Sequence, residues 1–231
     1  MRAIHFSLWL ENWITRTFAA LRPGDDGGLR DVMKLYSHPV SPFARKARII
    51  AHELGIKLEI VHIESARNDT DLRKINPLKQ IPVLVLDDGS SLFDSPVICE
   101  YLNHTGGGKF FPGMNIFKHN SGRWKALGLA ALGDGIADAA VAWRYEKTEA
   151  EDRRNLDRIA RCQATINAGL DALERVNFAK DPTIGEISVA CALGYIDFRL
   201  TDLDWKSSRP KLSAWYAQFC EYPSMKATAP K

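Results

Sequence analysis

The chain has 231 residues and a net charge of +3, with 45% hydrophobic and 26% charged residues. This length is enough for one large domain or two small ones with buried cores, and the composition is ordinary for a soluble globular protein. The 31 basic and 28 acidic residues are nearly balanced, so nucleic acid and membrane surfaces are not expected as partners.

Four cysteines are spread along the chain without the spacing of a redox or metal motif. They stand at positions 99, 162, 191 and 220, so no two of them form a Cys-x-x-Cys pair. No histidine or cysteine partner lies at zinc-finger distance, and no metal site is expected. Three fall inside helical patterns, which predicts reduced core thiols and a reducing, cytoplasmic location.

Residues 1–32 do not match the rest of the chain. Their one short apolar patch is interrupted by Glu11 and Asn12, which makes it too short for a membrane span and poor as a signal-peptide core. The stretch PGDDGG at 23–28 predicts a flexible break before a strand that begins at Met33. We expect a dispensable extension, with a docking helix and a targeting helix as alternatives.

From Met33 onward, strand-like and helix-like patterns alternate. Period-2 runs predict strands, the 3.6-residue period predicts helices, and Asp-Asp-Gly-Ser predicts the turn of a hairpin. In chain order, we expect a strand at 34–37, a helix at 42–54, a strand at 56–63, a helical turn before Pro77, a hairpin at 82–93 and a helix at 95–105. This order predicts a thioredoxin-like α/β domain over residues 33–105.

The second half of the chain is predicted to be helical throughout. Residues 106–118 are predicted to be a linker, and residues 119–225 an all-helical domain. The expected helices are 119–147, 150–177, 184–200 and 210–221. Three glycines at 128, 133 and 135 are unfavourable inside a helix, so we expect a close approach of another helix there. The fold class is therefore α+β with two domains, the α/β domain first and the helical bundle second.

Three short motifs of the first half concern chemistry. A thioredoxin-like redox protein would carry Cys-x-x-Cys at 38–41, where this chain has His-Pro-Val-Ser. Ser41-Pro42 and Ser95-Pro96 each place serine at the N-cap and proline at the first position of a helix. Pro82 stands at the start of a strand. Taken singly, each serine motif is explained by helix capping, and Pro82 is explained as a proline at the start of a strand.

Together, the three motifs predict a binding site for a short thiol-containing peptide. In a thioredoxin-like fold the Ile81–Pro82 bond is expected to be cis, with the Ile81 backbone pairing with the peptide as an added strand. The helix that begins at Ser95 would bind a carboxylate. The helix that begins at Ser41 offers a hydroxyl donor in a positive field, which suits a thiolate. Glutathione has these groups in this order.

The sequence resembles the glutathione S-transferase superfamily, in particular its bacterial serine-type members. The stretches that carry the resemblance are SPFARKAR, NPLKQIPVLV, LFDSPVICEYL, ALGDGIADA and ACALGYIDFR. They cover residues 33 to about 225 in order. The resemblance implies a detoxifying transferase with glutathione as co-substrate, acting as a homodimer.

The resemblance also implies roles for individual residues. Ser41 is implied as the catalytic residue, with Ser37 and Tyr36 as alternative donors to the thiol. The glutathione-binding residues implied are Ser41, Arg67, Gln80, Ile81, Pro82, Asp94 and Ser95. Residues implied near the electrophile are Phe43, Trp143, Arg144 and Tyr145, for which packing or surface exposure is the alternative. Asp134 and Asp138 lie four apart, on a helix face toward either the cleft or solvent.

The function predicted is activation of the glutathione thiol as a thiolate for attack on a small hydrophobic electrophile, without a metal. A second enzymatic hypothesis is a glutathione-dependent isomerase, dehalogenase or peroxidase with the same fold. A regulatory or binding protein that kept the fold and lost the chemistry is a third. In the second domain, Thr183-x-x-Glu186 predicts a capping box whose role is stability rather than chemistry.

Overall fold

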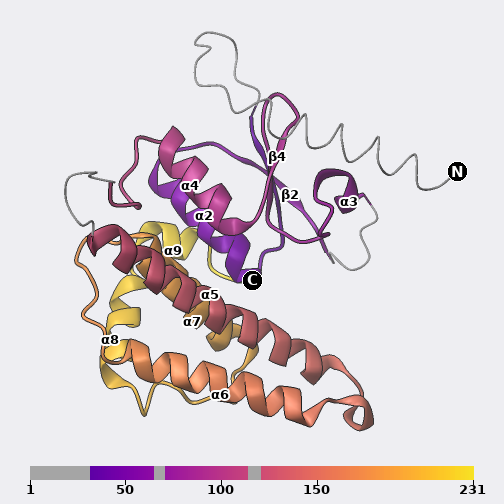
Figure 1. Ribbon diagram of the computed structural model, residues 1–231, viewed down its shortest axis with the longest axis vertical. Coiled ribbons are helices and arrows are strands. Elements are labelled where there is room, and N and C mark those ends of the chain that lie inside the picture. Colours follow the sequence, from indigo (N-terminus) through magenta and orange to yellow (C-terminus); the bar gives the residue numbers. More distant parts are fainter. Residues whose placement is uncertain (1–31, 65–70, 114–120) are drawn as a thin grey trace, which may run out of the picture.

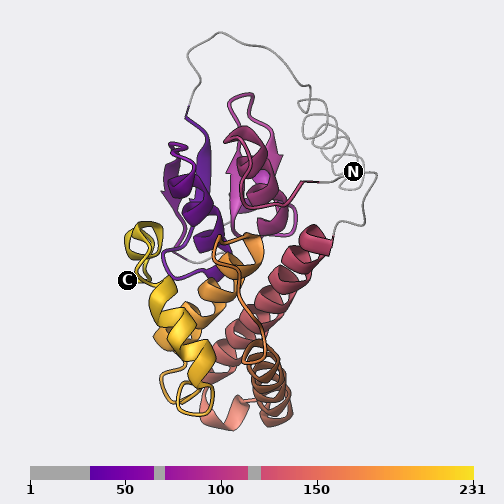
Figure 2. The same cartoon turned by 90° about the vertical axis from the view of Figure 1, so that its left-hand side faces the viewer.

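The computed structural model describes residues 32–64, 71–113 and 121–231. A small α/β part is followed by a larger helical part, and the two are stacked on each other (Figures 1 and 2). The expected extension at 1–32 lies outside the described residues, except for Val32. The fold is that of a thioredoxin-like domain with a helical domain behind it, as the sequence predicted.

The α/β part is built on one four-stranded sheet with the strand order β2-β1-β3-β4. Its strands are β1 (Lys34–Ser37), β2 (Glu59–His62), β3 (Val83–Val85) and β4 (Ser91–Leu92). β1 runs parallel to β2 and antiparallel to β3, and β3 pairs with β4 as the predicted hairpin. Leu35 faces Leu84 across the central pair, and both side chains are fully buried.

Helices cover this sheet and connect its strands. They are α2 (Pro42–Glu53), the single turn α3 (Leu72–Ile75) and α4 (Ser95–Thr105). β2 begins at Glu59, three residues later than predicted, because Gly55 takes a left-handed φ of 66° and the Ile56 amide bonds back to Ala51. That arrangement closes the C-terminus of α2 and takes residues 56–58 out of the sheet.

Two details at the edge of the sheet decide how the site is built. The Ile81–Pro82 bond is cis, as predicted, and the Phe93–Asp94 bond is cis as well. Ser95 is not the N-cap of α4, contrary to the prediction. Asp94 holds that place, and its carboxylate accepts a hydrogen bond from the Ser95 amide. The cap is thus an anion at the positive end of the helix, and the Ser95 hydroxyl is not needed for capping.

The second part is helical within the described residues. Its helices are α5 (Ser121–Thr148), α6 (Leu156–Leu173), α7 (Ile184–Arg199), α8 (Pro210–Phe219) and α9 (Pro223–Ala227). α6 begins later than predicted because Asn155 caps it, accepting a 2.9 Å bond from the Arg158 amide, after a 3-10 turn at Glu151–Arg153. The short helix α9 was not predicted. It returns to α2, where the Arg45 guanidinium donates to the Met225 carbonyl at 3.0 Å.

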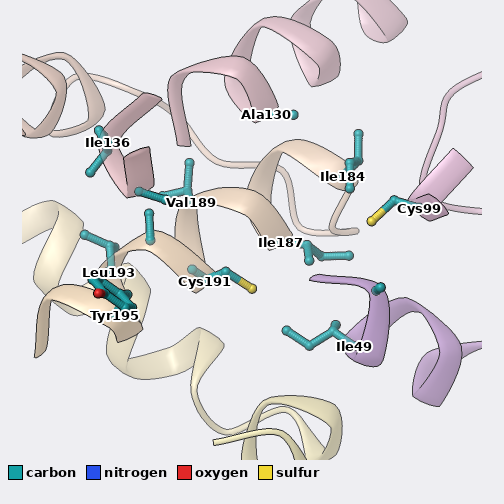
Figure 3. Packing of buried hydrophobic residues seen from close by; sticks show 14 of the residues in the cluster. Ile49, Cys99, Ala130, Ile136, Ile184, Ile187, Val189, Cys191, Leu193 and Tyr195 are labelled. Atoms are coloured by element: carbon teal, nitrogen blue, oxygen red, sulfur yellow. The ribbon is translucent and has the colours of Figure 1, made fainter. Parts of the chain in front are cut away.

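The core of the helical part surrounds α7, which is buried from Ile184 to Ile196 (Figure 3). α5 packs along it, and α2 covers it from the first domain. A Cβ at Gly133 would lie 2.7 Å from the Ser188 backbone, so close helix approach explains this glycine, as predicted. Gly128 and Gly135 have no such neighbour, and the prediction was wrong for both.

α5 is long and partly apolar. The helix Gly122–Thr148 is long enough to cross a membrane and contains an 18-residue stretch with the mean hydropathy, 1.3, of such a segment. In the fold, however, this helix packs along α6 and α7, which is the position of a core helix. Length and composition are therefore explained here by packing within the protein.

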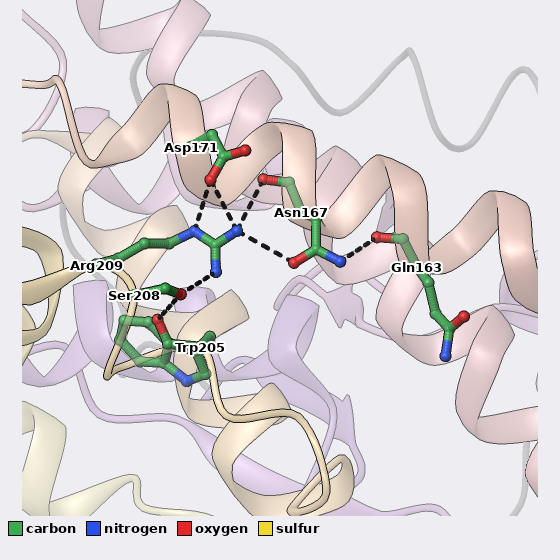
Figure 4. A network of polar contacts seen from close by, with 6 residues as sticks. All are labelled: Gln163, Asn167, Asp171, Trp205, Ser208 and Arg209. Carbon is green, nitrogen blue, oxygen red and sulfur yellow. Dashed lines mark hydrogen bonds and ion pairs between the residues drawn. The ribbon is translucent and has the colours of Figure 1, made fainter.

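A polar network ties the loop before α8 to α6 at the far end of this domain (Figure 4). Arg209 is buried, and its guanidinium pairs with Asp171 at 2.7 Å. It also donates to the Asn167 side chain at 3.1 Å and to the Ser208 hydroxyl at 3.0 Å. Because several partners share the buried charge, this arginine stabilises the packing of the segment before α8 against α6.

Candidate functional site

A cleft of about 890 Å³ lies between the two domains. The α/β domain contributes the turn before α2, the loop before β3 and the N-terminus of α4, and the helical domain contributes α5 and α7. Its lining includes His38, Val40, Ser41, Phe43, Gln80, Ile81, Asp94, Ser95, Asp134, Asp138, Arg144, Tyr145, Tyr195 and Arg199. Six of the sequence-predicted glutathione or electrophile residues from the first domain therefore meet in one place.

Ser41 lies in this cleft at the N-cap of α2. The tight turn from His38 places it there, since the Ser41 amide donates to the His38 carbonyl at 3.0 Å. Its hydroxyl oxygen accepts a 3.3 Å bond from the Ala44 amide. A hydroxyl has one proton to donate besides its lone pairs. The Ser41 proton therefore remains available for a group that approaches the helix N-terminus from the cleft.

The two alternative donors of the first strand do not line the cleft. Ser37 is buried, and its hydroxyl donates to the His38 carbonyl at 3.5 Å. Tyr36 is half-buried in β1. Of the three hydroxyl groups that the sequence offered for thiol activation, the one that faces the cleft is that of Ser41.

Ser95 presents a second hydroxyl to the same cleft. The residue is 1% exposed, and its oxygen has no hydrogen-bond partner among the described residues. Buried hydroxyl groups in proteins are nearly always hydrogen-bonded. Asp94 already caps α4, so the Ser95 hydroxyl and the next free amides of the helix are placed for an oxygen anion of a ligand.

The loop before β3 carries Gln80 and Ile81 into the cleft. Asn76 fixes this loop, because its side-chain amide donates to the Gln80 carbonyl at 2.9 Å. Pro82 is buried behind them and does not line the cleft. Arg67 lies outside the described residues, so its predicted role has no structural counterpart here.

The residues implied near the electrophile divide by helix face. Phe43 and Tyr145 line the cleft, whereas Trp143 is 5% exposed and belongs to the hydrophobic core. The reason is the helical period: residues 138, 141, 145 and 148 of α5 share one face, and position 143 points away from it. The expectation for Trp143 therefore fails, while Arg144 does reach the cleft.

A buried ion pair joins the two domains beside the cleft. Lys46 on α2 contacts Asp134 on α5 with 2.6 Å between Nζ and Oδ1, and their side chains are 2% and 23% exposed. Burial raises the pKa of Asp134, and the charge and hydrogen bond of Lys46 offset part of this rise. Sequence reasoning placed Asp134 on a cleft or solvent face but missed its partner, because Lys46 reads as part of the polar face of α2.

Asp138 follows one turn after Asp134, and both face the cleft rather than bulk solvent. Burial raises the pKa of Asp138, and the negative charges of Asp134 and Asp94 add to the effect. These three carboxyl groups form an acidic wall. It suits a ligand ammonium group and repels a second anion.

The other end of the cleft is basic and was largely missed from the sequence. Tyr195 and Arg199 lie four apart on α7, and both line the cleft together with Arg144. The spacing in GYIDFR was the available signal, since residues four apart on a helix share a face. His38 borders this end: burial lowers its pKa, and the positive charge of Arg199 lowers it further.

No three histidine, cysteine, aspartate or glutamate side chains within the described ranges are grouped in a way that could hold a metal ion. The four cysteines are reduced, and three of them are buried. Burial raises the pKa of Cys99 to about 12 and that of Cys191 to about 11. These two thiols are therefore protonated core groups at neutral pH rather than nucleophiles.

Comparison with known proteins places the chain in a family. The family model described as glutathione S-transferase, N-terminal domain, matches residues 35–110, and that of the glutathione S-transferase C-terminal domain matches residues 157–218. The uncharacterized GST-like protein YibF of Escherichia coli K12 is 33% identical over 187 residues, which cover 78% of this chain and 90% of that protein. The chain belongs to the glutathione S-transferase family.

Solved structures of similar proteins include two of a glutathione transferase family member from Pseudomonas fluorescens Pf-5. The first holds glutathione, is 38% identical with a TM-score of 0.78, and covers 86% of this chain and 99% of its own. The second holds S-(propanoic acid)-glutathione, is 36% identical with a TM-score of 0.75, and covers 86% of this chain and 100% of its own.

Proposed function

We propose that the protein binds glutathione in this cleft and transfers it to a small hydrophobic electrophile, with Ser41 stabilising the glutathione thiolate. The observation that carries the proposal is the pairing of two serine hydroxyls in one cleft. Ser41 has a proton available at the N-terminus of α2, and the buried Ser95 hydroxyl has no partner among the described residues. The solved relatives that hold glutathione and a glutathione conjugate support it.

Glutathione fits the order of polar groups along the cleft. Its γ-glutamyl carboxylate is assigned to Ser95 and the first amides of α4, and its ammonium group to the acidic wall of Asp94, Asp134 and Asp138. The peptide in the middle is assigned to the backbone of Ile81, with the glycyl end near Gln80. The thiol then lies toward Ser41.

The chemical task is to shift the thiol toward its thiolate. A free thiol with a pKa of about 8.5 is only about 3% ionised at pH 7. Lowering that pKa by about two units requires about 2.7 kcal/mol in favour of the thiolate. A charge-assisted hydrogen bond from Ser41 in the field of the helix N-terminus is of this size.

No group of the protein is oxidised or reduced in the transfer. The thiol proton leaves to solvent, and the sulfur forms a bond to an electrophilic carbon. In a substitution, the leaving group departs with the bonding pair. In an addition to an activated double bond, the π pair takes up a proton from solvent. His38, Tyr145 and Val141 line the space beside Ser41 where this carbon would lie.

The test is calorimetric titration of the full chain with glutathione, followed by the ultraviolet absorbance of the bound thiolate. We expect binding, with a thiolate band in the parent that falls in Ser41→Ala. A chain that does not bind glutathione would reject the proposal and favour a binding protein that lost this chemistry. Binding with an unchanged band in Ser41→Ala would assign thiol activation to another donor.

The cytoplasmic location and the homodimer belong to the same proposal. The location rests on the cysteine pattern, and the dimer rests on the family resemblance alone. Light scattering of the purified chain tests the dimer, with twice the chain mass of 25.9 kDa as the expected result.

A further inference from the structure

Arg144 and Arg199 are unusual among the arginines of this protein. Arg144 lies on α5, Arg199 is the last residue of α7, and both are half-buried in the cleft. Every other described arginine that is buried or half-buried donates a side-chain hydrogen bond: Arg45, Arg48, Arg123, Arg154 and Arg209. Within the described ranges, the side chains of Arg144 and Arg199 have no hydrogen-bond or ion-pair partner. The contact of Arg199 is with the ring of its neighbour Phe198, at 4.9 Å.

Arg144 and Arg199 come from different helices but line the same cleft as Tyr195, which lies one helical turn before Arg199 on α7. Burial raises the pKa of Tyr195 to about 12, and the positive charges of Arg199 and Arg144 both oppose that rise. The Tyr195 hydroxyl is thus protonated at neutral pH, close to two cations, and able to donate a hydrogen bond. Two cations and a hydroxyl donor on one side of a cavity form a binding site for an anion.

The acidic residues that line the cleft are Glu64, Asp94, Asp134 and Asp138, and within the described ranges none of them forms an ion pair with Arg144 or Arg199. Asp134 pairs with Lys46, and the charged groups that shift the pKa of Asp138 are Asp134, Asp94 and Lys46. On the α5 side of the cleft, two aspartates at 134 and 138 are therefore followed by a cation at 144, which lies with Arg199 of α7 in the same cleft. Arg144 and Arg199 line the same cleft as Ser41 and His38, and the His38 carbonyl accepts the Ser41 amide at 3.0 Å.

We propose that the electrophile carries a carboxylate, which Arg144 and Arg199 bind in the half of the cleft formed by α5 and α7. This inference rests on the proposed function, since it names the class of the second substrate of the same site. The reacting carbon lies over Ser41 and the carboxylate points toward Tyr195. An apolar body between them fits the lining by Val141 and Tyr145.

The anion could instead be the glycyl carboxylate of glutathione itself, and the experiment separates the two sources. Two product-like ligands of equal size are compared by calorimetry on the full chain: S-carboxyethylglutathione and its neutral amide, S-carbamoylethylglutathione. We expect the carboxylate to bind at least about tenfold more tightly than the amide, which corresponds to about 1.4 kcal/mol.

The same pair of ligands is then measured on Arg144→Gln and Arg199→Gln. Each variant is expected to reduce the preference for the carboxylate to about threefold or less, with the affinity for glutathione changed by less than about twofold. Arg144→Lys and Arg199→Lys keep the charge and should restore part of the preference. The matched control is Arg161→Gln, which removes an exposed arginine on α6 and should leave all affinities unchanged.

Two results overturn the inference while leaving the proposed function in place. One is a parent chain that binds both conjugates equally well. The other is a loss of affinity for glutathione in the arginine variants as large as the loss for the carboxylate conjugate, which would assign both arginines to glutathione. A parent chain that binds neither glutathione nor the conjugates overturns the proposed function, and this inference with it.

Discussion

Helices α2 and α7 are both capped by a hydroxyl side chain, but the two N-termini have different roles. Ser41 makes one long side-chain bond, 3.3 Å from the Ala44 amide, and faces the cleft. The Thr183 hydroxyl accepts a hydrogen bond from the Gly185 amide at 3.1 Å, and the Glu186 carboxylate accepts one from the Thr183 amide at 2.9 Å. The second N-terminus is closed by its own side chains, whereas the first remains open toward a ligand.

The buried charge that follows each cap differs in the same way. Glu186 is 4% exposed, and its other oxygen accepts the Ala179 amide at 3.2 Å, so its partners are all local. Lys46 is as deeply buried but pairs with Asp134, 88 residues away on α5. The Glu186 carboxylate stabilises the start of α7 through hydrogen bonds to nearby residues. The long-range pair instead fixes the open N-terminus of α2 against the second domain.

Lys46→Met tests the long-range pair and should have the largest effect. It leaves the Asp134 carboxylate partly buried without a cation, which costs about 3 kcal/mol of unfolding free energy at neutral pH. Without Lys46 the folded-state pKa of Asp134 rises further above its unfolded value. The loss of stability is therefore complete at pH values above the folded-state pKa of Asp134. It disappears as the pH falls from that folded-state pKa to the unfolded-state pKa, because Asp134 is then protonated in the folded protein.

Urea unfolding of Lys46→Met at pH 7 and near pH 4 measures this effect. The matched control is Lys226→Met, which removes an equally short ion pair to Glu221 in which both side chains are more than half exposed. That change should cost less than about 1 kcal/mol. Equal losses in the two variants would show that burial of the Lys46 pair does not matter.

Ser41→Ala tests the open cap and should affect the rate more than the stability. Loss of about 2.7 kcal/mol of thiolate stabilisation corresponds to a fall of about 100-fold in kcat/KM. The capping bond itself contributes only about 1 kcal/mol to folding. Conjugation of a chromogenic electrophile, measured beside thermal unfolding, separates the two effects. Ser37→Ala is the control, and an equal fall in its rate would contradict the assignment of Ser41.

Most of the fold could be predicted from local sequence because its signals are local. Periodicity, the glycine after α2 and the turn residues of the hairpin define the strands and helices, and Thr183-x-x-Glu186 defines the start of α7. Errors occurred where a cap competed with periodicity. Asn155 moved the start of α6, and Asp94 displaced Ser95 as the cap of α4.

The candidate site could be predicted on one side only. The first-domain residues lie in three short motifs that the fold brings together, so Ser41, Ile81 and Ser95 were within reach of sequence reasoning. The second-domain side depends on the rotation of α5 and α7 about their axes, which tertiary packing sets. Trp143 was therefore placed wrongly, and the Lys46 pair and Arg199 were missed.

Glu186→Gln tests the closed cap at its buried carboxylate. One amide oxygen can replace only one of the two carboxylate oxygens, so either the Thr183 or the Ala179 amide is left without an acceptor. Because Ala179 is exposed and Thr183 is half-buried, water can reach the released amide, and loss of one hydrogen bond to a carboxylate should cost about 1.5 kcal/mol of unfolding free energy. Chemical denaturation measures the loss, and the calorimetric affinity for glutathione should stay at the parent value. A matching loss of affinity would tie this N-terminus to the cleft after all.

Thr183→Ala is the mildest change and gives the clearest contrast with Ser41→Ala. It removes the bond to the Gly185 amide but leaves the Glu186 carboxylate on the Thr183 backbone. We expect a loss of about 1 kcal/mol in unfolding free energy and no change in glutathione affinity or rate. Thr183→Ser should recover most of the stability because it keeps the hydroxyl. An unchanged melting temperature in Thr183→Ala would show that the carboxylate alone closes this helix, and the contrast between the two caps would then rest on Glu186.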